Sequence, residues 1–165
     1  LLGSREKIFL KYNIIPHAKP TFMAKSGFLF VGRLEQGKGI VTLLETWQHL
    51  KQNYILKIIG SGPLEDDLKR KFQKENIVFL GSLSSGSVQL HMANAKFLIQ
   101  PSLYYETFGL TILEAMAQGT PVIGFNIGTR PEFIEHNKNG FIVESEMLEQ
   151  SLFEFENIPN YHKLC

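Results

Sequence analysis

The sequence has little of three things: cysteine, long apolar runs and net charge. Its only cysteine, Cys165, is the last of 165 residues, so no internal disulfide can form, which is compatible with a reducing cytosolic setting. No stretch approaches the roughly 20 consecutive apolar residues that a membrane-spanning helix needs. The opening segment LLGSREKIFLKYN is too short, and carries charge too early, for a signal peptide. These absences predict a soluble domain.

The charges nearly cancel, because 17 basic residues face 16 acidic ones for a net charge of +1. The chain therefore has no overall attraction to nucleic acid or to an anionic membrane surface, and any electrostatic function must be local. The 5 histidines are scattered, and none has a second candidate ligand at the spacing of a metal site. We expect no structural zinc.

The sequence is rich in short apolar runs that end in turn residues. Continuous apolarity over four to six residues is typical of strands buried on both faces, as in a parallel sheet. Helical patterns separate the runs: Ile40, Leu43, Leu44, Trp47 and Leu50 form one stripe, and Leu64, Leu68 and Phe72 form another. The predicted strands lie within residues 28–32, 55–60, 76–81, 96–102, 121–125 and 140–143.

This alternation predicts an α/β fold: a doubly wound, Rossmann-like parallel sheet of about six strands with helices on both faces. Residues 1–27 show no sustained periodicity and are predicted to be a linker with a frayed helix. The folded domain then covers residues 28–155, with a last helix near 146–155, and residues 156–165 form a tail. Ligands of such sheets bind outside the carboxyl ends of the strands, so the loops there are the candidate sites.

The first of these loops, VGRLEQGKGI, contains Gly32, Arg33 and Lys38. A guanidinium and an ammonium a few residues apart can hold a diphosphate from two sides, although both could instead be solvated surface charges. In the second loop, Gly60 begins a Gly-Ser-Gly turn that lets a ring or a ribose approach the backbone, or that simply starts a helix. In the third, Leu83 and nearby backbone groups could contact a base.

The fourth loop, within YYETFGLTILEAMAQGTPV, carries Glu106 and Glu114. A helix that begins near Gly109 would offer free N–H groups to an anion, with Leu110, Leu113 and Ala117 directed inward. Glu114 would lie about a turn and a half into that helix, so the two acids should do separate jobs. One interpretation makes Glu106 a helix cap and Glu114 a buried acid held by backbone groups; the other gives Glu114 the hydroxyls of a sugar as partners.

Five motifs in register resemble one known family, the donor-binding C-terminal domain of group 1 (family 4) glycosyltransferases of the GT-B fold. The motifs cover roughly residues 28–143, and each falls at a predicted strand end. They are GRLEQGKG, IIGSGPLEDDL, NIVFLG, PSLYYETFGLTILEAMAQGTPVIGF and GTRPEFIEHNKNGFIV.

The resemblance implies a role for each matching residue. Arg33 and Lys38 would hold the donor diphosphate, and Glu106 and Glu114 match the E-x7-E motif, with Glu106 near the transferred sugar and Glu114 on the ribose. The residues implied in donor binding are Gly32, Arg33, Lys38, Gly60, Leu83, Glu106, Phe108, Gly109, Leu110, Thr111 and Glu114, of which Glu106, Arg33 and Lys38 are the catalytic candidates.

Two departures from the family pattern concern the donor pocket. Thr107 stands where many members have glycine, and IGTRPE at 127–132 replaces a commoner Gly-Gly-x-Pro-Glu. The second departure places Thr129 and Arg130 near the pocket. The identity of the donor is therefore less firmly implied than donor binding.

The family also implies the reaction and its setting: retaining transfer of a hexosyl or N-acetylhexosaminyl group from a nucleotide-diphosphate sugar, with a UDP-sugar favoured, to a saccharide or lipid-linked acceptor. No cofactor and no metal are implied. The acceptor would bind through a missing N-terminal domain, so we expect this chain alone to be inactive. The implied location is cytoplasmic, with peripheral association of the full enzyme at the inner face of the membrane, in the synthesis of polysaccharide such as lipopolysaccharide O-antigen.

Two other functions fit the same residues. A non-catalytic nucleotide-binding or regulatory module could share the fold, and would have no use for the Glu106 carboxylate at the sugar end. A nucleotide-sugar epimerase of this fold is disfavoured, because its histidine-bearing acid/base pattern is not evident in the sequence.

Overall fold

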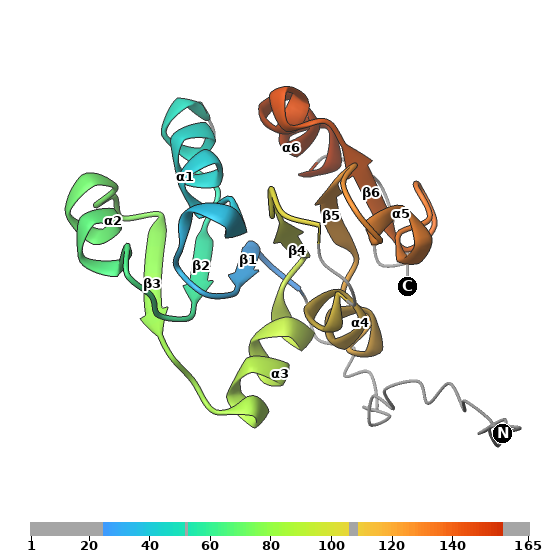
Figure 1. The fold of residues 1–165 in the computed structure, drawn as a ribbon, viewed down its shortest axis with the longest axis horizontal. Coiled ribbons are helices and arrows are strands. Elements are labelled where there is room, and N and C mark those ends of the chain that lie inside the picture. Colours follow the sequence, from blue (N-terminus) through green and yellow to red (C-terminus); the bar gives the residue numbers. More distant parts are fainter. Residues whose placement is uncertain (1–24, 52, 106–108, 157–165) are drawn as a thin grey trace, which may run out of the picture.

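The computed structural model describes residues 25–51, 53–105 and 109–156, and its centre is one six-stranded parallel sheet (Figure 1). The strand order is β3-β2-β1-β4-β5-β6. Every apolar run predicted from the sequence contains one of these strands, which confirms the α/β class. Their bounds are β1 Phe28–Val31, β2 Leu56–Ile59, β3 Ile77–Gly81, β4 Phe97–Gln100, β5 Val122–Phe125 and β6 Gly140–Val143.

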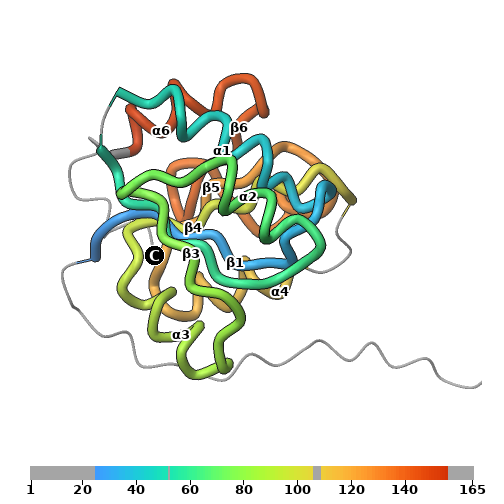
Figure 2. The backbone as a smooth tube through the Cα atoms, turned by 90° about the vertical axis from the view of Figure 1, so that its left-hand side faces the viewer, coloured from blue at the N-terminus to red at the C-terminus, as the bar shows by residue number. Residues whose placement is uncertain are grey.

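Helices cover both faces of the sheet, as Figures 1 and 2 show for α1 and α6 on one side and for α3 and α4 on the other. The two faces have separate apolar clusters because side chains alternate along each strand: Phe28 and Phe30 join the first cluster, and Leu29 joins the second. The bounds are η1 Gln36–Lys38, α1 Ile40–His49, α2 Glu65–Lys71, α3 Ser85–Asn94, α4 Leu110–Ala117, α5 Arg130–Phe133, η2 Ser145–Met147 and α6 Leu148–Glu156.

Aromatic rings fill the larger cluster, between the sheet, α1 and α6. Phe141 and Phe155 stack with ring centroids 3.7 Å apart, and Phe97 contacts both. Trp47 of α1 packs edge-on against Phe28, and its indole N–H donates to the Tyr54 carbonyl at 3.1 Å. Burying such rings supplies much of the apolar area that holds α1 and α6 on the sheet.

The chain reverses its direction of winding between β1 and β4, which are neighbours in the sheet but far apart in sequence. At such a switch point the loops after the two strands diverge to opposite faces and leave room for a ligand between them. The loop after β1 leads into η1 and α1, and the loop after β4 leads toward α4.

The inward face of α4 was predicted wrongly. Ile112 and Ala115 are its buried residues, whereas Leu110 is 44% exposed and Leu113 and Ala117 are only partly buried. The reason is composition: six of the eight helix residues are apolar, so no single stripe stands out and periodicity cannot select the buried side. Packing against α3 and the sheet selects it instead.

Candidate functional site

The loops after β1 and β2 meet at two glycines. Gly60 has φ +135°, and a Cβ built on it would lie 1.9 Å from the Gly32 carbonyl oxygen. Only glycine permits this approach, so the two loops touch through backbone. The Leu34 N–H also donates to the Ser61 carbonyl at 3.0 Å, and the Gly60 N–H donates to Gly81 at the end of β3 at 2.9 Å. Three consecutive strand ends are thereby fixed to one another.

These three loops surround a hollow of about 300 Å³ at the carboxyl ends of β1, β2 and β3. Its wall combines apolar side chains with two serines, whose hydroxyl oxygens lie 2.8 Å apart in a hydrogen bond from Ser82 to Ser61. Gly32, Arg33, Gly60 and Leu83, all predicted from the sequence, line it. The full lining is Val31, Gly32, Arg33, Ile59, Gly60, Ser61, Ser82, Leu83 and Val88.

The second half of the β1 loop, η1, sits on the segment that follows β4. The Gly37 carbonyl accepts hydrogen bonds from the Leu103 N–H at 2.9 Å and from the Ser102 hydroxyl at 3.1 Å. The Gly37 Cα lies directly under the Tyr104 ring, since a Cβ there would be 1.8 Å from a ring carbon. Lys38, the last residue of η1, is therefore fixed relative to the β4 loop.

The two predicted cations differ in their surroundings. The Arg33 side chain is 67% exposed and forms an ion pair with Glu35 at 2.9 Å, within its own loop. Lys38 is partly buried at the end of η1. Arg33 is therefore a surface cation at the mouth of the hollow, and it can exchange Glu35 for a ligand anion at small cost because exposed ion pairs are weak.

Helix α4 begins without a side-chain cap. Its first residue is preceded by Gly109, whose φ of +55° is left-handed and which has no side chain to cap the helix. Leu110 and Thr111 carry the first helical N–H groups. Glu114 is partly buried, and within the described residues no hydrogen bond or ion pair engages its carboxylate. The first interpretation of the sequence, a buried acid held by backbone groups, is therefore wrong for Glu114. Glu106, Thr107 and Phe108 lie outside the described residues.

Sequence reasoning missed the structural position of Arg130. This residue is only 1% exposed, and its guanidinium donates to backbone carbonyls of two loops. Nη1 donates to Phe125 and Ile127 at 3.3 and 2.9 Å, and Nη2 donates to Ser102 and Tyr104 at 2.7 and 3.0 Å. The sequence offered no signal for this position, because Arg130 falls at the variable residue of the Gly-Gly-x-Pro-Glu pattern and no local pattern tells a buried arginine from an exposed one.

The family model for group 1 glycosyl transferases matches residues 14–160. The chain belongs to the group 1 glycosyltransferases. A glycosyltransferase of Methanocaldococcus jannaschii is 36% identical over 121 residues, which are 70% of this chain and 31% of that protein. The O-antigen chain mannosyltransferase C of Escherichia coli is 32% identical over 138 residues, which are 79% of this chain and 37% of that protein. The chain thus spans well under half the length of these relatives.

Solved structures place this glycosyltransferase domain in the GT-B fold. TarM of S. aureus superposes with a TM-score of 0.81 and 24% identity, over 97% of this chain and 34% of TarM. HepE of Anabaena, solved in complex with UDP and glucose, gives a TM-score of 0.74 and 22% identity, over 85% of this chain and 41% of HepE. At these identities the likeness establishes the fold, and the site must be argued from the residues themselves.

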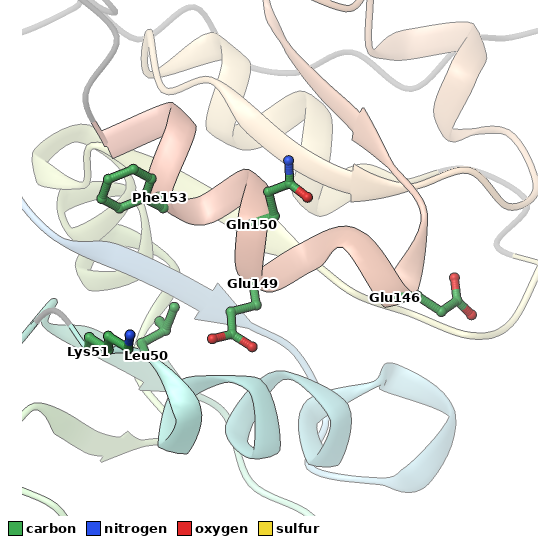
Figure 3. A pocket seen from close by; sticks show the side chains of 6 residues that line it. All are labelled: Leu50, Lys51, Glu146, Glu149, Gln150 and Phe153. Atoms are coloured by element: carbon green, nitrogen blue, oxygen red, sulfur yellow. The ribbon is translucent and has the colours of Figure 1, made fainter.

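A larger hollow of about 400 Å³ lies elsewhere on the glycosyltransferase domain, between the end of α1 and α6 (Figure 3). Figure 3 shows Glu149 extending from α6 toward α1. Two carboxylates against the single cation of Lys51 would repel a diphosphate, and none of the described residues in the loops after β1 to β4 lines this hollow. The lining is Leu50, Lys51, Glu146, Glu149, Gln150 and Phe153.

Two further properties bear on ligands and location. Among the residues that the structure describes, no three His, Cys, Asp or Glu side chains gather as a metal site would require. Within the same ranges, every helix is too short or too polar to cross a membrane.

Proposed function

We propose that this domain binds the nucleotide-diphosphate sugar donor of a retaining glycosyltransferase. The base occupies the hollow at the ends of β1, β2 and β3, and the diphosphate lies between Arg33, Lys38 and the first turn of α4. Glu114 accepts hydrogen bonds from the ribose hydroxyls. Glu106, outside the described residues, is assigned to the transferred sugar by its position in the sequence motif.

One observation carries the proposal: the four loops that would contact the donor are joined by backbone hydrogen bonds. Gly32 and Gly60 bring together the loops around the hollow, and the Gly37 carbonyl joins η1 to the segment after β4. A rigid frame of this kind holds base and diphosphate groups at a constant separation, which lowers the ordering cost of binding.

The charges support diphosphate binding. Cleavage of the sugar–phosphate bond leaves developing negative charge on the nucleoside diphosphate. At about 3 Å and an effective dielectric constant near 20, each cation–oxygen pair contributes roughly 5 kcal/mol before desolvation. Arg33, Lys38 and the uncapped α4 terminus can together supply the stabilisation that a divalent ion gives in other enzymes.

Glu114 supports the ribose assignment. Its carboxylate is partly buried on α4 and has no hydrogen bond or ion pair to another described residue. A partly desolvated carboxylate is stabilised by hydrogen-bond donors that replace lost water, and two adjacent hydroxyls provide such donors. We favour a UDP-sugar as the donor, in line with the UDP bound to HepE. One relative is named as GDP-mannose-dependent, so GDP-sugars are the donors to test against UDP-sugars.

The acceptor is a saccharide or a lipid-linked saccharide that meets the donor at the rest of the full-length enzyme. The name of the O-antigen chain mannosyltransferase supports a place in polysaccharide synthesis. The full-length enzyme would work in the cytoplasm, at the inner face of the membrane. The transfer is metal-independent and needs no cofactor. Because the chain spans a minority of its relatives' length, we expect little or no transfer by these 165 residues alone.

A thermal-shift and calorimetric screen against UDP, GDP and ADP, and their glucose or mannose conjugates, tests donor binding. A ligand at 100 times its Kd stabilises the folded state by about 2.7 kcal/mol, which is a shift in Tm of about 5–10 °C for a domain of this size. Arg33→Ala should reduce the shift, whereas the matched control Arg70→Ala, on the exposed surface of α2, should leave it unchanged. No shift with any nucleotide would refute the proposal.

Catalysis is tested in the full-length enzyme. Arg33→Ala or Lys38→Ala should lower kcat about a hundredfold or more, because each removes a group that stabilises the leaving diphosphate. Near-normal turnover would remove that assignment. If Glu106→Ala changes neither turnover nor the preference for nucleotide-sugar over nucleoside diphosphate, the alternative of a non-catalytic nucleotide-binding module is favoured.

A further inference from the structure

Arg130 is a buried cation whose described hydrogen bonds all end on backbone. It is 1% exposed, and four of its hydrogen bonds go to carbonyl oxygens of Phe125, Ile127, Ser102 and Tyr104. Burying a guanidinium is costly unless its donors are satisfied, so a fold retains one where the bonds it makes are needed. Here the bonds connect the segments that follow β4 and β5, where the pairing between these two strands has ended.

The two arms of the guanidinium divide between the loops. Nη1 holds the turn after β5, and Nη2 holds the segment after β4. A planar fork with fixed angles sets the distance between its partners in a way that a flexible ammonium cannot. Arg130 therefore fixes the separation and orientation of the two loops on the far side of the switch point from the hollow.

Hydrogen bonds also link the segment that Arg130 holds after β4 to the loop after β1, which carries Arg33 and Lys38. Ser102, whose carbonyl accepts from Nη2, donates its own hydroxyl to the Gly37 carbonyl at 3.1 Å. The next N–H, that of Leu103, donates to the same carbonyl at 2.9 Å. A displacement of the β4 loop would therefore move η1 and, with it, Lys38. The hollow is held by different contacts, those of Gly32, Gly60 and Ser61.

We propose that Arg130 is a positioning residue for the donor diphosphate: it holds the β4 loop so that Lys38 and the first turn of α4 face the same phosphates. The inference rests on the proposed function. Arg130 does not itself contact the donor, because its guanidinium lies beneath the loops and donates to their carbonyls. Its effect should therefore appear in the contribution of the diphosphate to affinity, and leave the contribution of the base unchanged.

The test compares nucleoside with nucleoside diphosphate. The 165-residue chain is titrated by NMR with uridine and with UDP, and in parallel with guanosine and with GDP. The affinity for each nucleoside diphosphate divided by the affinity for its nucleoside gives the factor that the diphosphate contributes. The variants are Arg130→Met, which removes the fork, and Arg130→Lys, which keeps the charge. Ser102→Ala removes one of the two hydrogen bonds to the Gly37 carbonyl. Arg70→Met, an exposed arginine of α2 paired with Asp67, is the matched control.

We expect Arg130→Met to lower the diphosphate-to-nucleoside ratio about tenfold to a hundredfold, as misplacement of a binding group by about 1 Å does. Arg130→Lys and Ser102→Ala should each lower it by a smaller factor, nucleoside affinity should stay at the wild-type value, and Arg70→Met should change neither. If Arg130→Met fails to fold by circular dichroism, Arg130→Lys and Ser102→Ala decide the question.

The possible failures are distinguishable. If the wild-type chain gains nothing from the diphosphate of either nucleotide, the proposed function itself is wrong. If the wild type shows the gain and the Arg130 and Ser102 variants keep it, the positioning role is wrong. An equal loss of nucleoside and diphosphate affinity would make Arg130 a purely structural residue, and would also overturn the inference.

Discussion

Two glycines of the loop after β1, Gly37 and Gly39, should differ strongly in how much stability is lost when each is replaced by alanine. Gly39 has φ +70°, and a Cβ there would lie 1.8 Å from the Pro101 carbonyl oxygen, a backbone atom. At Gly37 the three atoms nearest to the equivalent Cβ are all ring carbons of Tyr104, a residue that is 59% exposed. The first clash cannot be relieved without moving backbone, whereas the second is relieved when the tyrosine side chain rotates into solvent.

The expected costs follow from these contacts. In Gly39→Ala the left-handed backbone costs about 1–2 kcal/mol, and separating η1 from the β4 segment loses two hydrogen bonds to the Gly37 carbonyl at about 1 kcal/mol each, for a total of about 3–4 kcal/mol. In Gly37→Ala the Tyr104 ring loses at most its buried part, about 80 Å² of a side chain of about 200 Å². That loss limits the cost to about 2 kcal/mol.

Urea unfolding followed by circular dichroism at 25 °C measures both costs. In a Tyr104→Ala background, Gly37→Ala should cost close to nothing, because the ring it displaces is gone, while Gly39→Ala should keep its full effect. The reasoning is refuted if Gly39→Ala costs no more than Gly37→Ala, or if Tyr104→Ala rescues Gly39→Ala.

Three further predictions concern other parts of the domain. Lys25→Met should lower the free energy of unfolding by about 1–3 kcal/mol in urea, because the ammonium donates to Gln118, Gly119 and Thr120 at the end of α4; the exposed Lys51→Met should not. Glu114→Gln should weaken UDP binding about tenfold but leave 2′-deoxy-UDP binding less affected, and equal losses in calorimetry would remove the ribose assignment. Burial and the nearby charge of Lys57 lower the pKa of His91, so its contribution to stability is present above pH 6.5, the ordinary value, and is lost as the pH falls. His91→Gln should therefore reduce the loss of unfolding free energy as the pH falls below 6.5. An unchanged slope of unfolding free energy against pH would contradict this prediction.

The strands were predictable because burial on both faces leaves a signal that is local in sequence. Runs such as FLFV and FLIQ are apolar at every or nearly every position, and their short length between turn residues favours a buried strand over a helix. The loops at their carboxyl ends were predictable for the same reason, since the end of a strand fixes where its loop begins. Arg33, Gly60 and Leu83 were found in this way, and all three line the hollow.

The side of α4 that is buried was not predictable, because an eight-residue helix with six apolar residues has no unique stripe. Nor was the burial of Arg130: its partners are carbonyls of residues 102, 104, 125 and 127, and backbone carbonyls look alike in every sequence. Only the folded chain shows which of them converge.

The sequence by itself therefore determined the class of sheet, the order of its elements and the positions of the loops at the strand ends, because hydrophobic periodicity and turn residues act over a few neighbouring positions. The tertiary structure alone decided which loops touch: Gly60 on Gly32, Gly37 under Tyr104, and Arg130 between the ends of β4 and β5. The contacts from Gly60 to Gly32, from Gly37 to Tyr104 and from Arg130 to the segment after β4 join residues 26 to 67 positions apart, and their energies depend on distances that no local pattern encodes.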